Sequence, residues 1–147
     1  MADLNKIKRM SLLVQLAQNN EDDRSKHLAQ ARAAMDDAKE QLANLQEYRA
    51  NYLESLRGKM SGASNPYNLT SYQQFVSQLA DAISQQERVV EQNQVFFEKI
   101  KSLWVHAREK RRSLERLRDE AKRQYEQQRD KKEEARILDD FVANKYR

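Results

Sequence analysis

Residues that could perform acid–base chemistry are present in this chain, but they are scattered. His27 and His106 lie far apart in the sequence, and adjacent carboxylates occur at Asp22-Asp23, Asp36-Asp37 and Asp139-Asp140. General acid–base catalysis needs two groups that reach the same substrate. Neighbours on a helix project about 100° apart, so the two members of each pair point in different directions. None of these residues predicts a catalytic site.

Other kinds of site chemistry also lack their residues. The chain has no cysteine, which excludes a thiolate nucleophile, a disulfide framework and a cysteine zinc site. It contains two glycines and carries no glycine-rich phosphate loop, HExxH motif or nucleophile elbow. We therefore expect no enzymatic activity, no metal and no cofactor.

The composition restricts the fold. Of 147 residues, 39% are hydrophobic and 34% are charged, and the mean hydropathy is −1.04. Such a chain is too polar for a deep globular core, so it is either disordered or a long coiled coil. The apolar run Met10–Val14 is far shorter than the roughly 20 residues that span a bilayer. With no targeting segment, the expected location is the cytoplasm.

Hydrophobic periodicity favours the coiled coil. Apolar residues recur at alternating steps of three and four from Ile7 to Leu56, interrupted at Glu21, Arg24 and Arg49. A second series runs from Tyr72 to Tyr125, interrupted at Gln86, Asn93, Arg111 and Arg118. These steps define the a and d positions of a heptad repeat. Each series, called a seam below, predicts one long amphipathic helix.

The residues between the two seams predict a turn. Gly58, Gly62 and Pro66 are the only glycines and proline in the chain, and both residue types interrupt regular structure. We expect helices over about 3–57 and 70–143, a hinge loop over 58–69, and a capping box from Thr70 and Gln73. The predicted fold is all-α, a long antiparallel two-helix coiled-coil hairpin. It should form one domain over residues 1–147, with Leu56 near Tyr72.

The second helix should be longer and overhang the first from about residue 124 to 147. The apolar residues of this overhang are Ile137, Leu138, Phe141, Val142 and Tyr146, and an unpartnered apolar patch indicates a binding terminus. Residues 99–132 carry thirteen basic and six acidic side chains. Basic residues with Trp104 could bind nucleic acid, but the interspersed acids would repel phosphate and favour a solvated or protein-binding face. We expect no nucleic-acid partner.

With both seams and the hinge in place, the chain resembles the flagellar FliJ family of type III export proteins. The resemblance rests on YRANYLESL at 48–56, NPYNLTSYQQFVSQLADAISQQ at 65–86, and Trp104 followed by EKRRSLERL at 109–117. It implies a non-enzymatic component of the export apparatus, needed for flagellum assembly and motility. The family looks like the two terminal helices of the rotary ATP synthase γ subunit.

The resemblance also implies partners. They are the flagellar export ATPase, the cytoplasmic domain of the export gate, and substrate chaperones. The protein would occupy the central hole of the ATPase ring and promote its hexamer. Membrane association would be peripheral, through these partners. Gate binding carries over to the tip residues Tyr48, Phe75, Leu79, Ala82 and Gln86. ATPase binding is assigned to the basic end, at Arg111, Arg112, Arg116, Arg118, Lys122 and Arg123.

Other functions remain open from the residues alone. An injectisome stalk protein would have the same architecture with different cargo. A nucleic-acid-binding coiled coil would show steeply salt-dependent binding. In a dimeric scaffold, the polar seam positions would set register or oligomeric state.

Overall fold

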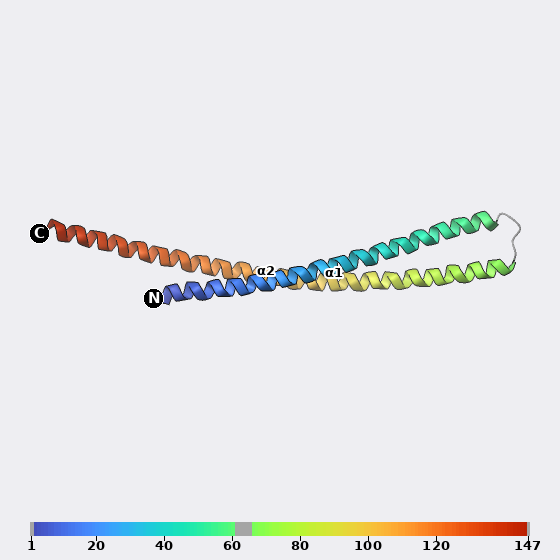
Figure 1. The fold of residues 1–147 in the computed structure, drawn as a ribbon, viewed down its shortest axis with the longest axis horizontal. Helices are drawn as coiled ribbons and strands as arrows, with labels where there is room; N and C mark the ends of the chain where they lie inside the picture. Colours follow the sequence, from blue (N-terminus) through green and yellow to red (C-terminus); the bar gives the residue numbers. More distant parts are fainter. Residues whose placement is uncertain (1, 61–65, 147) are drawn as a thin grey trace. The chain divides into compact units, whose positions relative to one another are not determined.

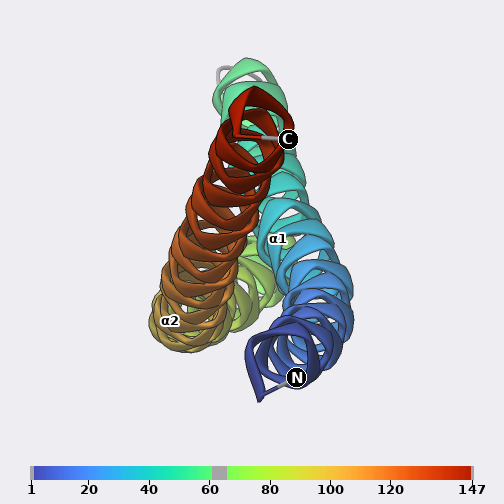
Figure 2. The same ribbon diagram turned by 90° about the vertical axis from the view of Figure 1, so that its left-hand side faces the viewer.

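A computed structural model describes residues 2–60 and 66–146 and contains two helices (Figure 1). Helix α1 spans Ala2–Met60 and α2 spans Pro66–Lys145. Each helix is labelled on its ribbon in Figure 1, and Figure 2 shows the same ribbons turned by 90°. The fold is all-α, with two long helices packed against each other as a hairpin, and α2 is the longer at 80 residues against 59. The predicted fold class is confirmed.

The heptad seams account for the buried surface. Every seam position from Ile7 to Leu56 and from Tyr72 to Tyr125 is buried or half-buried. Among the other described side chains of α1, Ser11 and Gln18 alone are shielded to that degree. The most buried apolar residues include Ala31, Ala38 and Ile83, at 3–4% exposure. Burial of one narrow stripe per helix explains why so polar a chain can fold.

The helix ends differ from the prediction. The expected loop over 58–69 is too long, because α1 continues to Met60 and α2 already begins at Pro66. Residues 61–65 of that loop lie outside the described residues. Gly58 sits in a helix with no positive φ, at a modest entropic cost, and proline suits a first helical position because its missing N–H is not needed there. Thr70 lies inside α2, so the predicted capping box is wrong.

The chain divides into two compact units. Unit 1 contains Met1–Ser25 with Leu103–Arg147, and unit 2 contains Lys26–Ser102. Each unit pairs a segment of α1 with a segment of α2. The expectation of one domain over residues 1–147 remains a prediction.

In unit 2 the helix register agrees with the prediction. Leu56 and Tyr72 line the same small pocket, and the rings of Tyr52 and Phe75 lie 4.7 Å apart. In unit 1 the register is marked by a contact from Arg111 to Glu21 across the seam.

Candidate partner-binding surfaces

An aromatic cluster joins the two helices near the turn, in unit 2. The Tyr52 ring lies 6.1 Å from Tyr72 and 6.5 Å from Tyr48, and Tyr48 meets Phe75 edge-on at 6.2 Å. Offset and edge-to-face arrangements are the favoured geometries of aromatic pairs. Tyr48 remains 53% exposed and Phe75 is half-buried. The cluster therefore closes the seam and still presents two rings at the surface.

The five predicted gate residues do not form one exposed surface. Tyr48, Phe75 and Ala82 retain accessible surface, whereas Leu79 is 7% exposed and packs in the seam. Gln86 is half-buried and donates from Nε2 to the backbone carbonyl of Ala38 at 3.0 Å, which ties α2 to α1. Leu79 and Gln86 hold the hairpin together, and Tyr48, Phe75 and Ala82 are the residues a partner could touch.

At the basic end, in unit 1, Arg111 is engaged inside the hairpin. Its guanidinium pairs with Glu21, which is 9% exposed, and with Glu115 at 3.0 Å. Hydrogen bonding to Glu21, and then to Glu115, raises the pKa of Arg111 above its usual value. Arg118 also occupies a seam position and contacts Asp119 at 3.2 Å. These two arginines are structural members of the predicted ATPase set.

The other members of that set are exposed to solvent. Arg112 lies 3.9 Å from Glu109, Arg116 donates to the Ser113 hydroxyl at 3.2 Å, and Arg123 pairs with Glu120. Lys122 is exposed as well. Exposed ion pairs contribute little to stability, so these arginines can readily exchange their neighbours for a partner's carboxylates. Arg116 and Arg123 are seven residues apart, so they share one face of α2.

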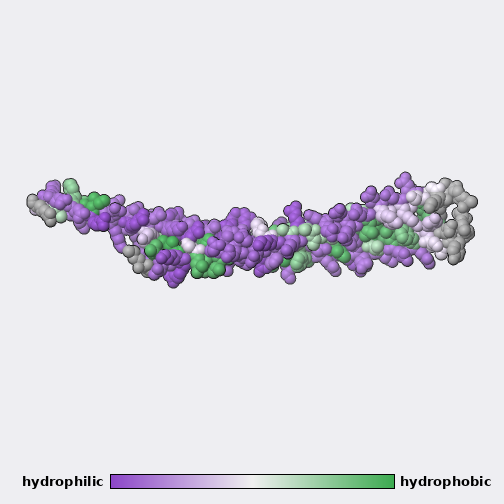
Figure 3. All heavy atoms as spheres, in the orientation of Figure 1, coloured by the Kyte–Doolittle hydropathy of each residue, from purple (hydrophilic) through white to green (hydrophobic). Residues whose placement is uncertain are grey.

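Beyond the seam, the described residues of α1 do not cover α2 within unit 1. Residues 126–146 are all exposed, and Ile137, Leu138 and Phe141 are 62–63% exposed. These residues are the apolar patch near the C-terminal end in Figure 3. The predicted overhang is thus confirmed as a helix with an unpartnered apolar face.

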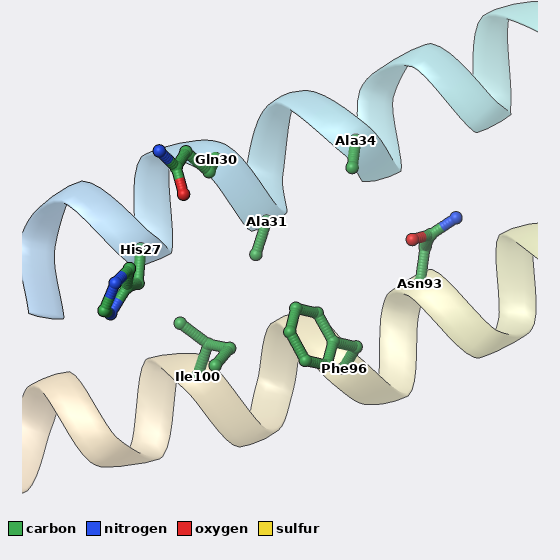
Figure 4. Close-up of a pocket in the computed structure, with 7 residues that line it drawn as sticks. All are labelled: His27, Gln30, Ala31, Ala34, Asn93, Phe96 and Ile100. Atoms are coloured by element: carbon green, nitrogen blue, oxygen red, sulfur yellow. The ribbon is translucent and has the colours of Figure 1, made fainter.

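Two surfaces were missed in the sequence. Arg129, Lys132 and Arg136 line a shallow cleft on the overhang with Glu133, and their helical spacing was a readable signal. In unit 2, Ala31 and His27 of α1 meet Phe96 and Ile100 of α2 around a groove of about 380 Å³ (Figure 4). Phe96 lies beside the seam and is 53% exposed. The signal for this groove was an apolar repeat outside the a and d positions.

The described residues hold no group of three or more His, Cys, Asp or Glu that could bind a metal ion. Over the same residues, no helix is long and apolar enough to cross a membrane. Trp104, which would stack on bases under the alternative nucleic-acid interpretation, is half-buried and has the Arg108 guanidinium 5.5 Å from its ring centroid. The Arg108 guanidinium therefore occupies a face of the Trp104 ring.

A coiled-coil hairpin whose exposed features are aromatic, arginine-rich and apolar surfaces is typical of proteins that act by binding partners. The family model described as "Flagellar FliJ protein" matches residues 6–147. The chain belongs to the FliJ family, as its motifs suggested, and is a non-enzymatic component of the flagellar export apparatus. No curated protein and no solved structure matches it. The match over nearly the whole chain favours the flagellar system over the injectisome.

Proposed function

We propose that this protein binds the flagellar export ATPase as a central stalk, promotes its hexamer and contacts the export gate. It would act at the cytoplasmic face of the inner membrane, associate with the membrane only through its partners, and handle substrate chaperones. The observation that carries the proposal is the exposed arginine face of unit 1 beside an uncovered overhang. The family membership supplies the choice of partners.

The basic end suits a partner whose contacts must form and break. Arg112 and Arg123 pair with acidic neighbours only at the surface, and Arg116 donates to the Ser113 hydroxyl there. Exchanging these contacts for a partner's carboxylates therefore costs little. Complementary charge at an interface rim mainly speeds association and sets orientation. The apolar residues Ile137, Leu138 and Phe141 could then bury against the ATPase and slow dissociation.

The first experiment measures the hydrolysis rate of the purified export ATPase with and without this protein, with light scattering on the same mixtures. We expect faster turnover together with a shift toward hexamers. The variant Arg116→Glu/Arg123→Glu should bind the ATPase about tenfold or more weakly, because rim charges of the wrong sign repel the partner.

A matched control tests whether the arginine face is specific. Arg32→Glu/Lys39→Glu reverses two exposed basic residues that are also seven positions apart, but lie in unit 2. It should bind the ATPase like the wild-type protein. Equal losses in both variants would indicate a non-specific charge effect, and unchanged binding of the arginine variant would refute this site.

Gate binding is tested separately at the tip. Replacing Phe75 with Ala removes an aromatic ring that is partly accessible, and we expect weaker binding to the cytoplasmic domain of the gate with ATPase binding unchanged. Leu53→Ala is the control, since Leu53 is 38% exposed on the opposite side of the same seam. If both variants bind the gate equally well, the tip assignment is wrong.

A further inference from the structure

One side of unit 2 is almost free of charge. In each helix the g position directly precedes an a position and the c position directly precedes a d position, so g and c residues share one side of the seam. We call the g and c residues within 27–55 and 75–99 the amide face. Asp37 and Lys99 are its only Asp, Glu, Lys or Arg residues, in a chain that is 34% charged. The other side of unit 2 carries Arg32, Lys39 and Glu87.

An apolar line runs along the amide face. Phe75, Ala82, Val89 and Phe96 follow one another at steps of seven residues on α2. Phe96 is 53% exposed, and the other three are half-buried. A repeat of seven keeps the same direction along a coiled coil, so this line offers contact to another helix running beside the hairpin.

The line opens into a groove at its centre. Phe96 and Ile100 rise from α2 toward Ala31 and His27 of α1, and the volume between them is about 380 Å³ (Figure 4). The flanking residues are amides, such as Gln92 beside Phe96 and Gln30 at the rim of the groove. Depletion of charge around exposed aromatic and aliphatic residues is the composition of a protein–protein interface core.

We propose that the amide face binds the amide face of a second copy of this chain. Tyr48, Phe75 and Ala82 belong to this face as well as to the proposed gate site, so a second copy and the export gate would compete for them. The helix that fits the groove must carry an apolar heptad line with uncharged polar flanks, and α2 itself has that pattern, with Gln78, Gln85 and Gln92 beside the line. In a two-fold symmetric contact the same surface serves both partners. Asp37 and Lys99 are opposite in charge, so two identical faces meet without net repulsion.

The size of the amide face is sufficient for a dimer. From Phe75 to Lys99 the helix extends about 36 Å, and two helices side by side are about 20 Å wide. This gives about 700 Å² on each copy, close to the roughly 800 Å² per partner found in specific complexes.

The test is sedimentation velocity of the full chain over a concentration range from about 1 µM to about 200 µM, where interfaces of this area associate measurably. We expect a reversible monomer–dimer equilibrium. Phe96→Glu buries a charge in the interface and should weaken dimerisation at least about tenfold. The matched control is Val95→Glu, because Val95 is 65% exposed but projects about 100° away from Phe96. It should dimerise like the wild-type protein.

A charge swap tests the face without altering its packing. Asp37→Lys and Lys99→Asp each give the face two like charges per copy and should weaken the dimer, and the combined variant should restore it. Circular dichroism confirms helix content in every variant. A wild-type chain that remains monomeric throughout the range would overturn the proposal. So would a dimer that is equally strong in Phe96→Glu and Val95→Glu.

Discussion

Glu21 and Arg111 place an ion pair where a coiled coil normally buries apolar side chains. Removing Arg111 leaves the Glu21 carboxylate, which is 9% exposed, without this partner, and an unpaired charge in the seam costs more than the pair contributes. Removing Glu21 leaves Arg111 still paired with Glu115. We therefore expect Arg111→Leu to lower the melting temperature by several degrees and Glu21→Leu to lower it less. The double variant should melt at or above the wild-type temperature, and thermal unfolding followed by circular dichroism decides this.

At neutral pH, the titration of Arg111 should not make the stability of the folded protein depend on pH. The pKa of Arg111 is raised in the folded protein, so its contribution to stability is complete below the unfolded-state pKa of arginine. It is lost only as the pH rises through the still higher folded-state value. A wild-type melting temperature that falls between neutral pH and the start of the alkaline range, while Arg111→Leu shows no such fall, would contradict this.

The aromatic cluster predicts a graded response in unit 2. Tyr52 contacts three other rings, whereas the Tyr48 ring is 53% exposed. Tyr52→Ala should cost about 2 kcal/mol of unfolding free energy, and Tyr48→Ala less than about 1 kcal/mol. Urea denaturation measures both. Equal losses would mean that ring contacts do not determine the stability of this end.

Heptad counting identified Glu21, Arg111 and Gln86 as polar seam residues but could not show what each one contacts. The exact partner across an antiparallel seam depends on register and on long side chains that reach across a turn. The family resemblance places Gln86 at the gate surface, and only the structure shows that its amide donates to the Ala38 carbonyl.

At the scale of the helices, Gly58 gives the clearest prediction. It lies within α1 without positive φ, and a methyl group added there would meet no atom within 4 Å. Gly58→Ala should therefore stabilise the protein by about 0.5–1 kcal/mol, because alanine loses less backbone entropy on helix formation. Chemical denaturation measures the change. A destabilised variant would indicate that the end of α1 needs the flexibility of glycine.

Helix existence and pairing could be predicted from the sequence because the seams are long and regular. The helix ends could not, because glycine and proline usually interrupt helices, whereas Gly58 and Pro66 are both helical here. A helix of 59 residues tolerates the cost of one glycine near its end, and proline is compatible with the first turn of α2.

At the scale of the whole chain, stability and binding should reside in different parts. Residues 126–146 are exposed, so a chain ending at Gln128 loses almost no buried surface. Its melting temperature should match that of the full chain, while ATPase binding and stimulation decline. A large drop in melting temperature would show that the overhang stabilises the hairpin.

The candidate surfaces were predictable to different degrees. The basic end and the overhang could be recognised from charge and apolar spacing along one helix. The amide face could not, because it appears only when residues of α1 and α2 are assigned to the same side of a two-helix seam. Ala31 and Phe96 are unremarkable separately and form a groove only together.

The uncovered end of α2 also bears on how long the protein survives in a cell. A helix whose side chains are all exposed opens readily and is an easy substrate for proteases, and residues 126–146 are all exposed. A bound partner would shield the segment, whereas surplus copies would be cut there first. The amount of this protein would then follow the amount of its partner, and correct stoichiometry would be maintained by degradation without any dedicated regulator.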